Sequence, residues 1–114
     1  MLVEKGADIN KADNNGVTPL LVASQEVHVE VVKVLVDKGA DINKADNDGV
    51  TPLIMASQGG HVEVVRVLVE KGADINKASN NGYTPLMTAR SREHYQIVNV
   101  LNLAARQSGS NQSL

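Results

Sequence analysis

The sequence contains no cysteine, phenylalanine or tryptophan, and Tyr83 and Tyr95 are its only aromatic residues. Without cysteine the chain has no disulfide framework, no cysteine-based zinc site and no thiol nucleophile. This composition fits a reducing compartment. With so few rings, binding through a wide aromatic patch is not expected.

An excess of charge of one sign is also missing. The 11 Lys and Arg residues stand against 13 Asp and Glu residues, which gives a formal net charge of −2. Without a basic run, attraction to nucleic-acid phosphates has no evident source. No apolar run approaches the roughly 20 residues needed to span a bilayer, and no signal-like segment follows Met1. We therefore expect an intracellular protein, cytoplasmic or nuclear, without nucleic-acid or membrane partners.

The sequence does contain an internal repeat. Residues 15–47 and 48–80 align over 33 positions and differ at only 8 of them. A further copy begins at Asn81 and diverges after Ala89, and residues 1–14 align with the end of a repeat. Units of this length cannot bury their own apolar faces and must stack. The repeat predicts a single array over 1–106, made of a partial repeat (1–14), two full repeats (15–47 and 48–80) and a terminal repeat (81–106).

Each repeat carries the signals of two helices. Thr18, Thr51 and Thr84 are favourable N-cap residues, and a proline follows each of them at the first helical position. These signals predict short helices, for example over 52–58. The next segment, about 61–71, is rich in β-branched valine, but its acidic start, basic end and closing glycine favour a helix over a strand.

Polar, turn-forming segments separate the repeats and are predicted to project as fingers. They cover residues 6–16, 39–49 and 72–82. Residues 1–5 are predicted to be the end of a helix, left either by a cut within a larger array or as a poorly capping half-repeat.

The chain changes character towards its end. The last helix is predicted over about 94–106, with more polar residues than its counterparts, as expected of a terminal repeat. Residues 107–114 contain too little apolar material to fold. They are predicted to be a disordered polar tail or a vector remnant.

One pattern of residues recurs in register through these units. It combines Gly-x-Thr-Pro-Leu, a following alanine, Gly-His-x-Glu-x-Val, a leucine and Gly-Ala-Asp-Ile-Asn. In the best copy it comprises Gly49, Thr51, Pro52, Leu53, Ala56, Gly60, His61, Glu63, Val65, Leu68, Gly72, Ala73, Asp74, Ile75 and Asn76. This pattern resembles the ankyrin repeat, and the resemblance covers residues 1–106.

The resemblance implies an all-α repeat solenoid of stacked antiparallel helix pairs with projecting β-hairpin loops, about three repeats plus a partial N-terminal one. It also implies a non-enzymatic module that binds a partner protein and needs no cofactor. The partner would contact the concave side formed by the fingers and the short helices. We expect the module to be a monomer, although the truncated first repeat could promote self-association.

Two positions depart from the family pattern. A histidine usually follows Thr-Pro-Leu, but Leu21, Ile54 and Met87 stand there, so the hydrogen bonds of that histidine must be absent. The glycine of the turn between the helices is replaced by Val27 and Glu93 in two copies. If this turn requires a positive φ, Val27 is strained by roughly 1 to 2 kcal/mol.

The partner-binding residues are expected where the repeats differ or where the fold has no use for a side chain. On the positions at which ankyrin proteins vary, the candidates are Ala12, Asn14, Asn15, Val17, Gln25, Glu26, Ala45, Asn47, Asp48, Val50, Gln58, Ala78, Asn80, Asn81, Tyr83, Ser91 and Arg92. Tyr83 is the sharpest candidate, because valine takes its place in the other repeats and tyrosine is enriched at interface hot spots. Alternatively, Tyr83 only covers the terminal repeat.

Other polar residues have structural explanations. His28, His61 and His94 are one period apart, and neighbouring helices pack about 8 to 10 Å apart, too far for three side chains to share one zinc ion. Each histidine is instead expected to help begin a helix. Two series of carboxylates, Asp8, Asp41 and Asp74 and then Asp13 and Asp46, are expected to stabilise turns. No catalytic motif is present, and we predict that the chain is not an enzyme.

Two further functions remain open. A leucine eight residues before an asparagine that follows Asp-Ile resembles the ankyrin motif recognised by asparaginyl hydroxylases. The matching pairs are Leu2 with Asn10, Leu35 with Asn43, and Leu68 with Asn76. The near-identical repeats also suit a structural spacer or an engineered scaffold without a ligand of its own.

Overall fold

The computed structural model describes the backbone of residues 8–112 and the side chains of residues 8–107. The helix end predicted over residues 1–5, Leu2 and the last two residues of the predicted tail lie outside the described residues. Six helices form within the described range: α1 (Pro19–Gln25), α2 (Val29–Asp37), α3 (Pro52–Gly59), α4 (Val62–Glu70), α5 (Pro85–Ser91) and α6 (Tyr95–Gln112).

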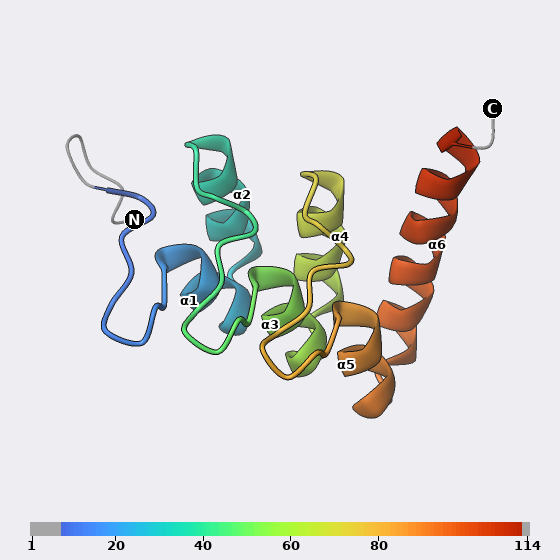
Figure 1. Cartoon of the computed structure of the whole chain (residues 1–114). Coiled ribbons are helices and arrows are strands. Elements are labelled where there is room, and N and C mark those ends of the chain that lie inside the picture. Colours follow the sequence, from blue (N-terminus) through green and yellow to red (C-terminus); the bar gives the residue numbers. More distant parts are fainter. Residues whose placement is uncertain (1–7, 113–114) are drawn as a thin grey trace.

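The helices form two rows. The short helices α1, α3 and α5 make one row, and the longer α2, α4 and α6 make the other (Figure 1). Each short helix packs against the long helix that follows it, and each helix also contacts its neighbour in the same row. The molecule measures 43 × 30 × 21 Å, so it is elongated along the stack. The predicted all-α repeat solenoid is confirmed.

The short helices begin at the predicted residues because their capping is local. The Oγ1 atoms of Thr18, Thr51 and Thr84 accept hydrogen bonds from the backbone N–H three residues later, at 3.1 to 3.3 Å. A proline occupies the first turn each time. The helix predicted over 52–58 ends one residue later, at Gly59.

The valine-rich segments are helices, as predicted, because helical spacing turns their apolar residues toward the core. Val32 and Leu35 of α2 and Val65 and Leu68 of α4 are almost fully buried. They pack in one continuous apolar cluster that runs through the successive repeats.

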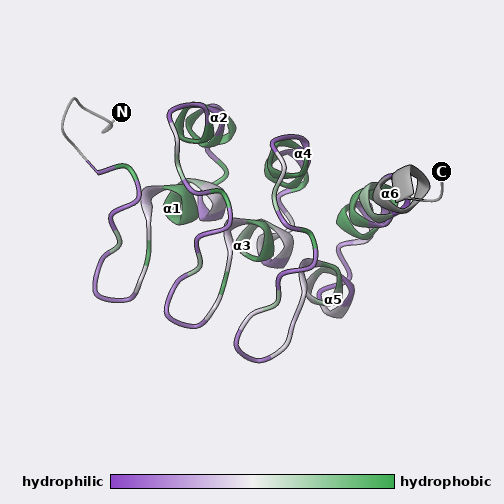
Figure 2. Ribbon diagram, turned by 45° about the horizontal axis from the view of Figure 1, so that its top comes forward, coloured by the Kyte–Doolittle hydropathy of each residue, from purple (hydrophilic) through white to green (hydrophobic). Residues whose placement is uncertain are grey.

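The fingers are three polar loops that run side by side (Figure 2). In the first, the N–H of Asp13 donates to the carbonyl of Val17 at 3.0 Å. The carboxylate of Asp13 accepts from the N–H groups of Asn15 and Val17 at 2.9 Å. The fingers turn as hairpins do, but each has too few cross-pairs to form a regular strand within residues 8–112.

The last helix is longer than predicted. α6 continues to Gln112 instead of ending at Arg106, so the prediction of disorder was wrong for residues 107–112. Ile97 and Leu101 anchor the helix in the core. A helix that is already nucleated extends at little cost, because each added residue makes a local hydrogen bond.

The turns between the helices have a positive φ, which is the condition under which Val27 is strained. Gly60 has φ 75°, and the non-glycine residues in its place, Val27 and Glu93, have φ 61° and 60°. Val27 is β-branched and therefore pays the larger steric penalty in this region. A Cβ at Gly60 would also lie 2.9 Å from the ring of His94, which packs over it from the next repeat.

We predict that Val27→Gly raises the free energy of unfolding by roughly 0.5 to 1 kcal/mol, since relief of the positive-φ strain exceeds the entropy cost of glycine. Gly60→Val should lower it by about 1 to 2 kcal/mol or more, because it adds that strain and presses on His94. Urea unfolding measures both changes.

Glu26→Gly is the matched control, because Glu26 precedes the strained residue and has φ −95°. Here glycine adds flexibility without relieving strain, so stability should fall. Equal midpoints for the wild type, Val27→Gly and Gly60→Val would contradict the interpretation of the turn.

Candidate functional site

The fingers and the short helices lie on the same side of the molecule. The fingers extend beyond the row of α1, α3 and α5 and away from α2 and α4 (Figure 2). The proposed partner-binding residues therefore share one surface, which we call the finger surface. It comprises the tips of the three fingers and the C-terminal ends of the short helices.

Backbone and side-chain hydrogen bonds join each finger to the next. The N–H of Asn47 donates to the carbonyl of Asn15 at 3.0 Å, and its side-chain amide donates to the carbonyl of Asn14 at 3.0 Å. Asn80 repeats both bonds, to Asp48 at 2.9 Å and to Asn47 at 3.0 Å. The amide nitrogens of Asn47 and Asn80 thus hold the array together, and these two predicted binding residues also have a structural role.

A second row of bonds involves the asparagines singled out for modification. The Oδ1 atom of Asn10 accepts from the N–H of Asp41 at 2.7 Å, and that of Asn43 accepts from Asp74 at 2.8 Å. The carboxylates of these aspartates accept from the N–H two residues later in their own fingers. They stabilise turns, as predicted. Asn76 is exposed, and no described residue donates to its side chain.

The remaining candidate residues are accessible to different degrees. Asn14, Asn15, Asp48, Asn81 and Tyr83 at the fingertips are exposed, as are Gln25, Glu26, Gln58, Ser91 and Arg92 at the helix ends. Ala12, Val17, Ala45, Val50 and Ala78 are half-buried between the fingers and the helices. The candidate residues at the tips are therefore uncharged and mostly amides, apart from Asp48.

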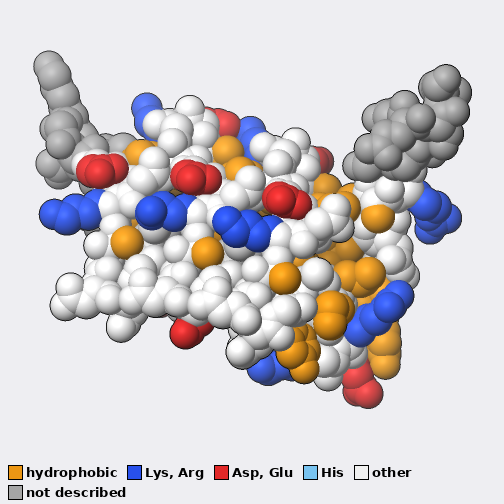
Figure 3. Space-filling model, in the orientation of Figure 1, with side chains coloured by type: hydrophobic (Ala, Val, Ile, Leu, Met, Phe, Trp, Pro, Cys, Tyr) orange, Lys and Arg blue, Asp and Glu red, His pale blue; other side chains and the backbone are white. Residues whose placement is uncertain are grey.

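Apolar side chains are exposed at the C-terminal end of the stack, on the third finger and α5. Tyr83 is 48% exposed and Met87 is 47% exposed. Hydrophobic side chains gather in this region, over α5 and α6 (Figure 3). Met87 was not among the candidate residues predicted from the sequence. Its position in the last repeat was the available signal. The equivalent residues Leu21 and Ile54 are each followed by another repeat, which buries them.

The three histidines do not converge on one site. Nε2 of His28 lies 3.4 Å from Oε1 of Glu26, whereas Nε2 of His94 lies 3.1 Å from the carbonyl of Gln58 in the preceding repeat. His28 and His61 occupy the N-cap positions of α2 and α4, but neither makes a side-chain capping bond. Among residues 8–112, no group of His, Asp or Glu side chains is arranged to hold a metal ion.

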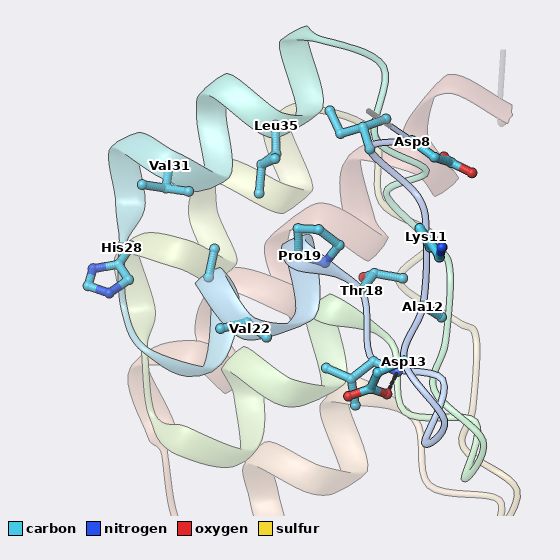
Figure 4. Close-up of a pocket in the computed structure, with 13 residues that line it drawn as sticks. Asp8, Lys11, Ala12, Asp13, Thr18, Pro19, Val22, His28, Val31 and Leu35 are labelled. Carbon is cyan, nitrogen blue, oxygen red and sulfur yellow. Dashed lines mark hydrogen bonds between the residues drawn. The ribbon is translucent and has the colours of Figure 1, made fainter. Parts of the chain in front are cut away.

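A hollow of about 730 Å³ lies at the N-terminal end of the stack. Figure 4 shows it between the first finger, α1 and α2, with Pro19, Val22, Val31 and Leu35 along its wall. The corresponding prolines in the later repeats, Pro52 and Pro85, are buried because the preceding repeat covers them. The hollow is therefore the surface on which another helix pair would stack.

The family model for ankyrin repeats in three copies matches residues 1–46 and 44–109. The chain is an ankyrin-repeat protein. Ankyrin repeats are generally protein-interaction modules, and the family is typically non-enzymatic. Comparison with curated proteins gives no significant match. In the part of the ankyrin array that the structure describes, no helix is both long enough and apolar enough to cross a membrane.

The hydrogen bonds between successive fingers lead to a prediction for two glycines in equivalent positions. Gly49 and Gly82 have φ 80° and 84°. A Cβ at Gly49 would lie 2.7 Å from the backbone nitrogen of Asn80, whereas nothing lies within 4 Å of a Cβ at Gly82. Gly82→Ala should cost about 1 to 2 kcal/mol from backbone strain alone. Gly49→Ala should cost about 1 kcal/mol more, because it also breaks the bonds of Asn80.

Urea unfolding at low protein concentration measures this difference between the two alanine variants. Gly16→Ala serves as a second test, since a Cβ there would meet the backbone nitrogen of Asn47 at 2.7 Å. If Gly49→Ala and Gly82→Ala were equally destabilising, the inter-finger bonds would contribute nothing to stability.

Proposed function

We propose that this ankyrin array binds another protein through its finger surface, with the third finger and α5 as the centre of the contact. The exposure of Tyr83 and Met87 carries the proposal. Both positions are apolar in every repeat, yet only in the terminal repeat are the side chains both large and about half exposed to solvent.

Tyr83 and Met87 provide the apolar contact area, and the fingertips provide hydrogen-bonding groups that orient the partner. Tyrosine buries a large ring at low entropic cost and offers a hydroxyl group to a polar partner atom. The exposed amides of Asn14, Asn15 and Asn81 offer both donors and acceptors. Such a surface fits a protein segment with an apolar side chain flanked by uncharged polar groups.

We predict that Tyr83→Ala weakens binding of a captured partner by about 1 kcal/mol or more, because it removes the apolar anchor. The experiment captures proteins from the native cell extract on the immobilised chain and then measures the affinity of each captured protein by calorimetry. The unfolding midpoint of the variant should stay close to the wild-type value, since about half of the Tyr83 surface is already in solvent.

Tyr95→Ala is the matched control, because Tyr95 is 62% exposed at the start of α6, outside the row of short helices. Its removal should leave the affinity unchanged. Equal losses for both variants would argue against the finger surface. If no protein is captured, the chain is better explained as a structural spacer or scaffold.

Modification of Asn76 is a second candidate function, favoured by one observation. Asn10 and Asn43 each hold the next finger through Oδ1, whereas the side chain of Asn76 is exposed. Leu68, the leucine of the same motif, is fully buried. An enzyme that recognises this leucine must therefore act on a locally opened form of the repeat formed by residues 48–80.

We predict that an asparaginyl hydroxylase adds one oxygen atom to Asn76 faster than to Asn43, because only Asn43 must first give up a bond to the next finger. Tandem mass spectrometry of the treated full chain locates the added oxygen. Leu68→Ala is the control for recognition of the motif. Faster oxidation of Asn43 would refute the protection argument, and no oxidation at either site would remove this candidate.

A further inference from the structure

The two ends of the finger ladder carry complementary polar groups. At each junction inside the array, one finger supplies three acceptors: an asparagine Oδ1 and two backbone carbonyls. The next finger supplies three donors: an aspartate N–H and both N–H groups of one asparagine. The two junctions repeat these bonds with donor-to-acceptor distances of 2.7 to 3.0 Å.

The same chemistry recurs at the two outer fingers. The last finger offers the acceptors of Asn76, Asn80 and Asn81, to which no described residue donates. The first finger carries Asn14 in the place of the donors Asn47 and Asn80. Residues 8–17 and 41–50 differ at a single position, where Asn15 replaces Asp48. The first finger therefore has the sequence that already binds a preceding finger elsewhere in this chain.

The space beside the last finger is also open. Gly16 and Gly49 lie against Asn47 and Asn80 of the following fingers, and a Cβ on either glycine would meet them at 2.5 to 2.7 Å. Gly82 has the same positive φ but no atom within 4 Å of such a Cβ. The position that an asparagine of a following finger fills at the inner junctions is free beside Gly82.

Each end of the stack also exposes apolar side chains that can pack against those of the other end. Met87 is 47% exposed at the C-terminal end, while its counterparts Leu21 and Ile54 are at most 3% exposed at the inner junctions. At the N-terminal end, Pro19 and Val22 are exposed beside the hollow shown in Figure 4.

We propose that the C-terminal end of this chain binds the N-terminal end of a second copy, with Asn14 of the second copy seated beside Gly82. The contact is head to tail, so each copy uses a different surface. Such heterologous contacts leave one free end at each side of a dimer and permit further addition.

Arg90 limits the strength of this contact. It stands in the place of Ser24 and Ser57, which are fully buried where neighbouring repeats meet. A guanidinium group at that position has to leave the junction or lose its water, and either arrangement reduces the apolar contact between copies. The association is accordingly weak and depends on protein concentration.

The test measures the mass of the full chain by sedimentation velocity over a wide concentration range. Asn14→Asp replaces the side-chain donor with a carboxylate of the same shape. This carboxylate repels the backbone carbonyl of Asn80 in the other copy. Gly82→Asn keeps a residue that tolerates positive φ but fills the free space. Each variant alone should bind itself at least about tenfold more weakly than the wild type, a loss of about 1.4 kcal/mol.

Mixing the two variants gives the decisive result. Asn14→Asp retains an intact C-terminal end, and Gly82→Asn retains an intact N-terminal end. A mixture therefore restores one working contact and should form one-to-one dimers that grow no further. A symmetric contact between two equivalent ends cannot give this complementation.

Two variants control for charge and for backbone strain. Asn15→Asp adds the same charge beside Asn14, at a position where the second finger already has an aspartate. Gly72→Asn tests the same substitution at another glycine with positive φ, 94°, and open space around its Cβ. Both should associate as the wild type does.

Arg90→Ser supplies a gain-of-function test. Serine restores the residue found at the inner junctions, and the dissociation constant should fall by about tenfold, again about 1.4 kcal/mol. The proposal is overturned if the wild type and Arg90→Ser both remain monomeric. It is equally overturned if association survives Asn14→Asp and Gly82→Asn, or if the mixture of the two fails to dimerise.

Discussion

The fold depends on burial of each helix pair against the next one. α2 and α4 have almost the same sequence, yet four residues of α4 are buried and only two of α2. The difference comes from their neighbours, because α4 lies between α2 and α6 while α2 has a described long helix on one side only. Stability in such a stack is a sum of units and junctions, so the middle repeat is the best supported.

The fingers add a polar junction to the apolar one. Asn47 and Asn80 bind the preceding finger through backbone and side chain together, and Asn10 and Asn43 bind the following finger through Oδ1. These bonds fix the distance and register between successive fingers, which places their tips on one surface. Asn47 and Asn80 thus belong to this surface and also join its fingers.

The terminal repeat differs most in sequence from the two full repeats. Inner repeats must fit a neighbouring repeat on each of two different faces, which keeps positions such as Leu21 and Ile54 buried and aliphatic. The last described repeat is free of that demand on one side, and there Tyr83, Met87 and Arg90 replace the inner residues. Both proposed contacts, with another protein and with a second copy, therefore use groups at this end.

The sequence by itself determined the repeat length, because the copies align residue by residue. It also determined the helix starts at the Thr-Pro steps, because each cap depends on a few adjacent residues. The continuation of α6 to Gln112, the exposure of Met87 and the bonds of Asn47 and Asn80 were decided only by the tertiary structure. The exposure and the bonds depend on which repeat lies next to which. The extension of α6 depends on a helix anchored by its packing at Ile97 and Leu101. Composition and spacing within one repeat therefore do not reveal which atoms meet across a junction.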